Sequence, residues 1–265
     1  MTSDNGSNQS ILRAVAILDA FLLGRPELRV TDVARQAGLG VSTASRLLST
    51  LESLGLVERD PISNLYRLGP KTVTLGGVAL NQSPVYRAAR QTAQNLAAEH
   101  GLGVNLAIRR DDQGFYLGNF EGRSAPRAFS LIGQSIPLHA TGLGKALLLG
   151  VDPAQRRALL GENLVGFTHR TITDHDRLDA ELATSGSRGY STEEEELALG
   201  RACLAAPIRN ASGEIVAALS ISGPLSAINL AAREAALATA VIEAADAVSV
   251  ALGHHGPARV IVSQR

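Results

Sequence analysis

GLGVSTASRLLSTLESLGLV, residues 38–57, joins two patterns that a single helix has to combine. Small and hydroxylated residues surround Arg46 at the start of this stretch, and leucines dominate everything that follows. A helix with this pattern exposes its polar start and packs its aliphatic remainder against the rest of a domain. What the exposed start contacts therefore decides what the protein does.

Two short helices joined by a tight turn are predicted here. Thr31 is a candidate N-cap for the first helix, and Gly38 is expected to end it with a positive φ. The second helix is expected to begin at Ser42, with three residues between it and Gly38. Small side chains at Ala34 and Ala44 would let the two helices cross closely. This arrangement is the helix-turn-helix pattern.

The flanking segments complete a small domain. A helix is expected before the pair, over residues 10–24, with Ser10 as its N-cap. Its inward face would carry four aliphatic residues, Ile11, Val15, Leu18 and Leu22. After the pair, LVERDPISNLYRLGP at residues 56–70 predicts a strand, a turn and a second strand, which is the shape of a wing.

In a helix-turn-helix, the start of the second helix lies in the major groove of DNA. Arg46 can form a bidentate contact with guanine, worth about 1–3 kcal/mol of discrimination between bases. The predicted DNA contacts are Thr31, Ser42, Thr43, Ser45 and Arg46 on the helices and Arg59 and Arg67 on the wing. An ordinary three-helix packing unit with a hairpin is the alternative.

Composition limits the remaining possibilities. The 265 residues predict two domains, and the 25 basic and 25 acidic side chains exclude a polybasic protein but not a small DNA-reading module. A single cysteine excludes an intrachain disulfide framework. Without a signal peptide or an apolar run of about 20 residues, a cytoplasmic protein that does not enter a membrane is expected.

The second part of the chain predicts an α+β domain. A helix over residues 83–101 precedes strands at residues 104–110, 114–120 and 127–133, which suggest an antiparallel meander. Later segments predict helices at 141–149, 153–160 and 177–188, strands at 203–210 and 214–223, and a long helix at 227–252. The expected division is a disordered tail (1–9), a winged helix-turn-helix domain (10–69), a linker helix (70–82), a ligand-binding domain (83–253) and a flexible tail (254–265).

One candidate ligand site lies at HATGLGKALL, residues 139–148. A helix starting at Thr141 would have glycines in its first turn, which leaves backbone N–H groups and the positive end of the helix dipole open to an anion such as a carboxylate. The alternative is that Thr141 only caps the helix, whose glycines permit close packing.

Two strands add polar side chains to the same hypothesis. Cys203 shares a strand face with Ala205, and Ser220 shares one with Ser222. Buried hydroxyls on an apolar strand need partners, and a polar ligand is one such partner. Arg201 would favour a carboxylate if it points inward and would be a surface cation if it points outward.

Alternative roles for residues in this part of the chain have less support in the sequence. The run 193–196 of four glutamates is typical of a solvated face, and only Glu193 is a candidate for lining a pocket. An enzyme would need Cys203 with His139, or Lys145 as an activated amine, but no third orienting group accompanies them. A redox role for Cys203 would need an external partner. No enzyme activity, metal site or cofactor is therefore expected.

Six segments in order resemble the IclR family of bacterial transcription regulators, over nearly the whole chain. They are ILRAVAILDAF, TDVARQAGLGVSTASRLLSTLESLGLVERD, YRLGP, IPLHATGLGKALL, RGYSTEEEELALGRACLAAPI and AALSISGP. The resemblance implies an N-terminal winged helix-turn-helix, a linking helix and a C-terminal GAF-like effector-binding domain, assembled as dimers or tetramers. It also implies operator DNA and a small organic acid as partners, and a repressor more often than an activator.

The resemblance assigns an effector pocket as well. The matching positions are Gly142, Leu143, Glu193, Arg201, Cys203, Ser220 and Ser222. Three positions depart from the family: Val41 stands where many members have lysine, Gly40 where proline is frequent, and Arg201 where an apolar residue is frequent. The loss of a lysine would shift affinity for DNA toward Arg46 and the wing, because residues 1–80 hold only eight basic against seven acidic side chains.

Overall fold

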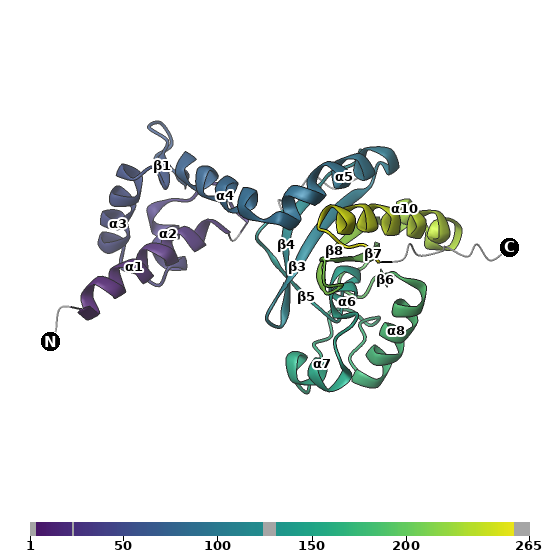
Figure 1. Cartoon of the computed structure of the whole chain (residues 1–265). Coiled ribbons are helices and arrows are strands. Elements are labelled where there is room, and N and C mark those ends of the chain that lie inside the picture. Colours follow the sequence, from purple (N-terminus) through teal and green to yellow (C-terminus); the bar gives the residue numbers. More distant parts are fainter. Residues whose placement is uncertain (1–3, 23, 124–130, 257–265) are drawn as a thin grey trace. The chain divides into compact units, whose positions relative to one another are not determined.

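The computed structural model describes residues 4–22, 24–123 and 131–256. The chain forms two compact units that meet at Gln82 and Ser83, and each is described here by itself (Figure 1). Residues 1–3 and 257–265, which belong to the two predicted tails, lie outside the described residues, as do residues 127–130 of one predicted strand.

The first unit is a helix-turn-helix with a wing. Its elements are α1 (Asp4–Asp19), the 3-10 turn η1 (Ala20–Leu22), α2 (Val30–Gln36), α3 (Val41–Ser53), β1 (Val57–Arg59), β2 (Tyr66–Leu68) and α4 (Pro70–Gln82). β1 and β2 pair in antiparallel fashion, and Leu28 adds a bridge to Tyr66. The fold class predicted for this part is confirmed.

The turn between α2 and α3 follows the prediction in its main features. Gly38 has φ +65°, a backbone conformation that glycine adopts without strain. Ala34 and Ala44 are buried where the helices cross, and the amide of Leu39 donates to the carbonyl of Ala34. The turn therefore holds the start of α3 at a fixed angle to α2.

Three details of this unit differ from the prediction. α1 begins at Asp4, so residues 4–9 are helical and Ser10 lies inside the helix instead of capping it. α2 begins at Val30, which places Thr31 in its first turn and makes Arg29 the N-cap.

The buried face of the first helical segment also differs. Ile17, Ala20 and Phe21 fill the core, whereas Ile11, Val15 and Leu22 are 61%, 48% and 69% exposed and Leu18 is half-buried. Apolar residues occur all round this helix, so periodicity could not decide which face packs on α2 and α3.

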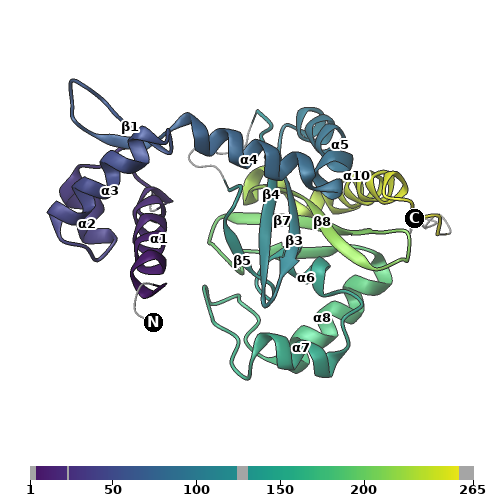
Figure 2. The same cartoon turned by 60° about the vertical axis from the view of Figure 1, so that its left-hand side comes forward.

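The second unit is an antiparallel sheet covered by helices on both faces (Figure 2). The six strands are β3 (Gly103–Arg110), β4 (Gln113–Phe120), β5 (Ser135–Pro137), β6 (Ser191–Glu194), β7 (Arg201–Arg209) and β8 (Ile215–Pro224). Their order is β5-β4-β3-β8-β7-β6, with every neighbouring pair antiparallel. The helices are α5 (Pro84–His100), α6 (Gly142–Leu148), α7 (Pro153–Leu160), α8 (His175–Arg188), α9 (Leu225–Ile228) and α10 (Leu230–Ala251).

Most boundaries in this unit agree with the sequence. Ser83 caps α5 by accepting from the amide of Tyr86, and Gly101 ends that helix with φ +69°. β6 was not predicted, because its glutamates suggested a solvated face. Of the third predicted strand, only residues 131–133 are described; they form no strand, and β5 follows them. The long predicted helix is divided at Asn229, which adopts φ +44°.

Helices cover both faces of the sheet, and the candidate ligand site lies on the face that α6 crosses. α5 and α10 pack on one face, and α6 crosses the other, with α7 and α8 beyond it (Figure 1). The core between α6 and α8 contains Leu143, Leu147, Leu178 and Leu182. Side chains that alternate on β3, β7 and β8 point toward α6 and surround the cavity described next.

Candidate functional site

The start of α3 presents the polar surface that the sequence predicts. Ser42, Ser45 and Arg46 are exposed, Thr43 is half-buried, and the helix is preceded by Gly40, which has no side chain to obstruct an approaching backbone. Within the described residues, no carboxylate pairs with the guanidinium of Arg46. Thr31, on α2, is also exposed.

The wing differs from the prediction in its charges. The Nε atom of Arg67 lies 2.6 Å from Oε1 of Glu58, and its Nη1 atom lies 3.5 Å from Oε1 of Glu27. Arg59 stacks over the ring of Tyr66, with its Cζ atom 5.7 Å from the ring centroid. Arg67 is therefore engaged by two acids of its own domain, which makes Arg46 the better candidate for a DNA contact.

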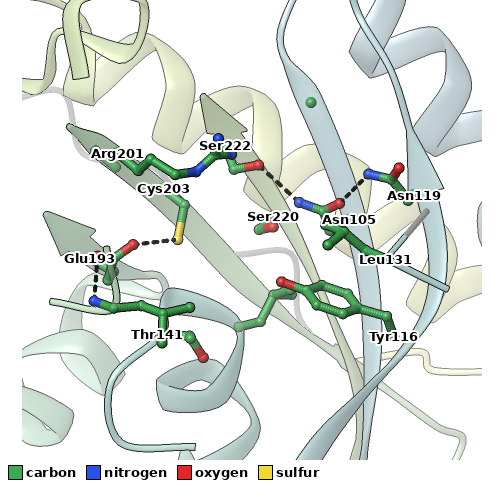
Figure 3. Close-up of a pocket in the computed structure, with 14 residues that line it drawn as sticks. Asn105, Tyr116, Asn119, Leu131, Thr141, Glu193, Arg201, Cys203, Ser220 and Ser222 are labelled. Carbon is green, nitrogen blue, oxygen red and sulfur yellow. Dashed lines mark hydrogen bonds between the residues drawn. The ribbon is translucent and has the colours of Figure 1, made fainter. Parts of the chain in front are cut away.

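A cavity of about 320 Å³ lies between the sheet and α6 (Figure 3). Six of the seven predicted positions line it: Leu143, Glu193, Arg201, Cys203, Ser220 and Ser222. Eight further residues were not predicted: Gly103, Asn105, Tyr116, Asn119, Leu131, Thr141, Leu197 and Ala202. The seventh predicted position, Gly142, contacts the cavity wall instead, since a Cβ atom added there would lie 2.6 Å from Sγ of Cys203.

Strand register explains why these side chains meet. Cys203 pairs with Glu193 on β6 and with Ser222 on β8, so these three form one row across the sheet. Ser220 pairs with Ala205 on β7 and with Asn105 on β3, and it therefore belongs to the next row. Because both rows are on the same face, residues far apart in the sequence share one wall.

Hydrogen bonds satisfy one of the two predicted serines and not the other. Asn119 Nδ2 donates to Asn105 Oδ1 at 2.7 Å, and Asn105 Nδ2 donates to Ser222 Oγ at 2.9 Å. The Ser220 side chain is 1% exposed, and its Oγ atom has no hydrogen-bond partner within the described residues. An unpaired buried hydroxyl costs about 1–3 kcal/mol, which a polar ligand in the cavity would remove.

The start of α6 lines the cavity through Thr141 and Leu143, but part of its first turn contacts the protein itself. Thr141 Oγ1 accepts from the amide of Gly144 at 2.9 Å and donates to the carbonyl of Pro137 at 2.9 Å. Gly142 lies directly against the thiol of Cys203. Two of the predicted open positions are thus covered by the protein itself, and α6 contains only seven residues.

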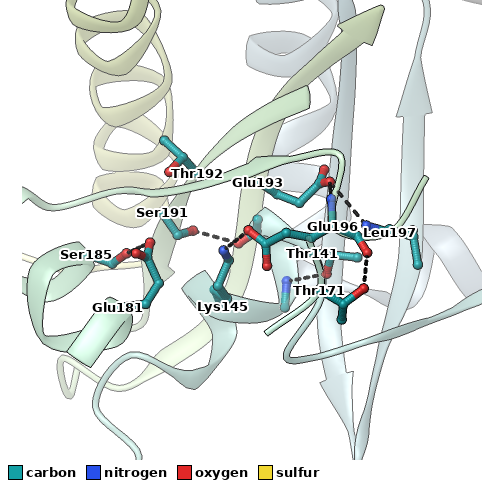
Figure 4. A network of polar contacts seen from close by, with 12 residues as sticks. Thr141, Lys145, Thr171, Glu181, Ser185, Ser191, Thr192, Glu193, Glu196 and Leu197 are labelled. Carbon is teal, nitrogen blue, oxygen red and sulfur yellow. Dashed lines mark hydrogen bonds and ion pairs between the residues drawn. The ribbon is translucent and has the colours of Figure 1, made fainter. Parts of the chain in front are cut away.

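Glu193 is buried in the cavity wall and organises the connection that follows β6 (Figure 4). Its Oε1 atom accepts from the amides of Glu196 at 2.7 Å and Leu197 at 3.3 Å, and Sγ of Cys203 donates to Oε2 at 3.7 Å. Burial raises the pKa of the Glu193 carboxyl above its ordinary value. Burial, with the charge of Glu193, also raises the pKa of the Cys203 thiol, which disfavours a thiolate nucleophile.

Glu196 corrects the prediction of a solvated glutamate run. Its Oε1 atom lies 2.6 Å from Nζ of Lys145, and the two residues are 8% and 1% exposed. Thr171 Oγ1 donates to the Glu196 carbonyl at 2.6 Å. Burial raises the pKa of the Glu196 carboxyl, and the neighbouring ammonium group opposes that change. Lys145 is therefore half of a buried ion pair.

Arg201, the first residue of β7, lines the cavity and is partly buried. Within the described residues, no carboxylate lies within ion-pair distance of its guanidinium. This placement favours the inward alternative over a surface cation. His139, the other component of the enzyme hypothesis, contacts the carbonyl of Val165 through Nε2 at 2.9 Å and packs on Phe167.

Comparison with known proteins covers both units. The family model described as IclR helix-turn-helix domain matches residues 10–61, and the one described as Bacterial transcriptional regulator IclR C-terminal matches residues 77–250. The chain is 34% identical to the transcriptional regulator BhcR of Paracoccus denitrificans over 93% of this chain and 88% of that protein. It is 33% identical to the transcriptional repressor IclR of Escherichia coli over 94% and 91%.

Solved structures give the same result. The IclR structure from Thermotoga maritima has a TM-score of 0.77 and 26% identity, covering 93% of this chain and all of that one. An IclR homolog from Microbacterium hydrocarbonoxydans, complexed with 4-hydroxybenzoate, has a TM-score of 0.77 and 26% identity over 92% and 98%. No helix in the described part of the chain combines the length and apolar character needed to cross a membrane.

Proposed function

Because the chain belongs to the IclR family of bacterial transcriptional regulators, we propose that it is a repressor whose operator affinity changes when a small organic acid binds its C-terminal domain. The two roles fall on different units of the chain. The start of α3 would bind DNA, and the cavity beside α6 would bind the effector.

The unpaired hydroxyl of Ser220 is the observation that carries ligand binding. Its burial without a partner leaves a donor and an acceptor directed at a space large enough for a small molecule. The volume of about 320 Å³ is at the lower end of the range for ligand pockets, so the effector is a small molecule. The relative complexed with 4-hydroxybenzoate supports an organic acid.

An exposed apolar surface supports self-association. α4 has no buried residue, and Val73, Leu75 and Val78 are 75%, 54% and 50% exposed. α1 exposes Ile11 and Leu12 in the same unit. Large exposed apolar groups of this kind are typical of protein interfaces, so two copies of the chain would cover them and present two copies of α3 to a pseudo-palindromic operator.

The ligand acts only through a difference in affinity. An effector that binds the DNA-competent and incompetent arrangements equally well changes nothing, whereas one that prefers the incompetent arrangement releases the operator. α4 connects the two units in the chain and is the segment through which such a difference would pass.

A thermal-shift screen of small organic acids, followed by gel shifts on DNA flanking the gene, tests this function. We expect a stabilising acid that also changes operator binding, with an affinity for DNA that falls as salt rises. Ser220→Ala should weaken the response to the acid and leave operator binding without it unchanged. Turnover of the bound acid without operator binding would instead favour an enzyme with a vestigial DNA module, and stimulated transcription would favour an activator.

A further inference from the structure

We propose that Arg201 binds the carboxylate of the effector at one end of the cavity and that Ser220 binds a hydroxyl group of the same molecule further in. This inference rests on the proposed effector site and adds to it the direction in which the ligand lies and the spacing of its two polar groups.

The guanidinium of Arg201 is a cation without a carboxylate partner among the described residues. Arg201 is the first residue of β7, two residues before Cys203 on the same face of the strand, and it lines the cavity there. Its side chain extends from β7 toward Ser222 (Figure 3). A guanidinium presents donors in a planar fork that matches a carboxylate, which identifies the chemistry of this end of the cavity.

The other end of the cavity, near α6, is unfavourable for a ligand carboxylate. Near α6, the cavity wall carries the carboxylate of Glu193, whose Oε1 atom already accepts two backbone amides. The amide of Gly144 is satisfied by Thr141, and Gly142 lies against Cys203. A ligand carboxylate placed there would meet an acid and no free cation, whereas Arg201 would remain unpaired.

The strand register sets the distance between the two polar groups of the ligand. Ser220 lies one row beyond Ser222 on β8, which is two residues along the strand and so about 7 Å. Arg201 itself pairs with Pro224, one row beyond Ser222, and its side chain extends back toward Ser222 (Figure 3), so a carboxylate held by its guanidinium would lie about one row from a ligand oxygen at Ser220. A hydroxyl adjacent to the carboxylate, as in a 2-hydroxy acid, is too close. A hydroxyl across an aromatic ring fits.

Apolar side chains line the cavity that contains the Arg201 guanidinium and the Ser220 hydroxyl. Leu131, Leu143 and the ring of Tyr116 line it and offer apolar surface to a ligand. The ligand class that results is a carboxylic acid with an apolar body and a hydroxyl at its far end.

Four chemical probes separate the two contacts: 4-hydroxybenzoate, benzoate, 2-hydroxybenzoate and 4-hydroxybenzamide. Calorimetric titration of the full-length protein should give the tightest binding with 4-hydroxybenzoate. Arg201→Met should weaken 4-hydroxybenzoate about 10- to 100-fold and leave 4-hydroxybenzamide unchanged, because only the acid uses the cation. Arg201→Lys should recover part of the loss. Ser220→Ala should remove the preference of 4-hydroxybenzoate over benzoate.

The opposite results overturn the inference. Equal losses for the acid and the amide in Arg201→Met, unchanged acid binding in that variant, or wild-type protein that binds none of the four probes would each contradict it. Operator binding by the same preparations reports separately on the proposed function, and thermal unfolding shows that each variant is folded. A protein that binds the operator but no probe is a regulator with a different effector class.

Discussion

The ammonium group of Lys145 lies 2.6 Å from the carboxylate of Glu196, and the protein buries both side chains. The pair joins α6 to the connection between β6 and β7, whose Leu197 lines the cavity on the far side of Glu193. The ion pair therefore links two walls of the candidate effector site, and the hydroxyl of Thr171 adds a hydrogen bond to the same connection.

Removing one partner of that pair should be strongly destabilising. Lys145→Met leaves the Glu196 charge buried and unpaired, which we expect to lower the free energy of unfolding by about 3–5 kcal/mol. The double variant Lys145→Met with Glu196→Met should recover most of the loss, because no buried charge remains. Urea unfolding of the two single variants and the double variant measures the coupling, and additive effects would show that the pair is not coupled.

Two glycines on helices of the same unit should respond to alanine in opposite directions. A Cβ atom at Gly144 would lie 2.4 Å from the carbonyl oxygen of Leu138, so Gly144→Ala should cost about 1–3 kcal/mol or more. At Gly186 on α8 no atom lies within 4 Å of such a Cβ atom, and Gly186→Ala should stabilise by up to about 1 kcal/mol. Thermal unfolding of both variants shows whether each substitution raises or lowers the stability. A Gly144→Ala variant as stable as wild type would contradict the packing of α6.

Glu193 should contribute a pH dependence to stability. Because its carboxyl pKa is raised in the folded protein, the favourable contribution is present below the ordinary value of 4.5 and is lost as the pH rises through the folded pKa. Glu193→Gln keeps an acceptor for the two backbone amides and removes the charge. Its stability relative to wild type should therefore increase from acid pH to neutrality in denaturation curves. Glu99→Gln, an exposed change on α5, is the control, and parallel curves for wild type and Glu193→Gln would refute the assignment.

The two arginines of the DNA-reading unit should differ in their effect on operator binding. Arg46→Ala should cost about 1–3 kcal/mol at the specific operator and flatten the preference among sequences. Arg67→Ala should cost less, because its guanidinium is paired with Glu58 and Glu27. Gel shifts across a range of salt concentrations compare the two. Uniform weakening on all sequences in Arg46→Ala would show that this residue contacts only phosphate.

A charge placed on α4 should weaken self-association. Val73 is 75% exposed in the single chain, so Val73→Lys leaves the fold of one chain intact while placing an ammonium group on the proposed interface. Sedimentation should show a shift toward smaller species. Val165→Lys, at a 62% exposed position of the other unit, is the matched control. An unchanged distribution in both variants would place the interface elsewhere.

Local patterns predicted the parts of the molecule that depend on neighbouring residues. Gly38 marked the turn before α3, Ser83 and Gly101 marked the ends of α5, and strand alternation placed Ser220 and Ser222 on one face. Each of these depends on backbone conformation within a few residues, which sequence reports directly.

Local sequence patterns could not predict contacts between segments that are far apart in the sequence. Asn105 and Ser222 are 117 positions apart, and Lys145 and Glu196 are 51 apart. Only the strand order and the placement of α6 bring them together. The run of glutamates around Glu196 was therefore predicted to be solvated, since no residue near it in the sequence indicates that Glu196 pairs with a buried lysine. Arg67 likewise pairs with Glu27, which lies 40 positions earlier in the connection between η1 and α2.

The close approach of Gly142 to the Cys203 sulfur bears on how this protein can diverge. A side chain at position 142 would collide with the thiol, so position 142 can gain one only if residue 203 becomes smaller. A descendant that shortened residue 203 to alanine would enlarge the chamber without disturbing the sheet or the helices behind it. Such a change would alter which small molecules fit the proposed effector site and would leave the helix-turn-helix unit unchanged.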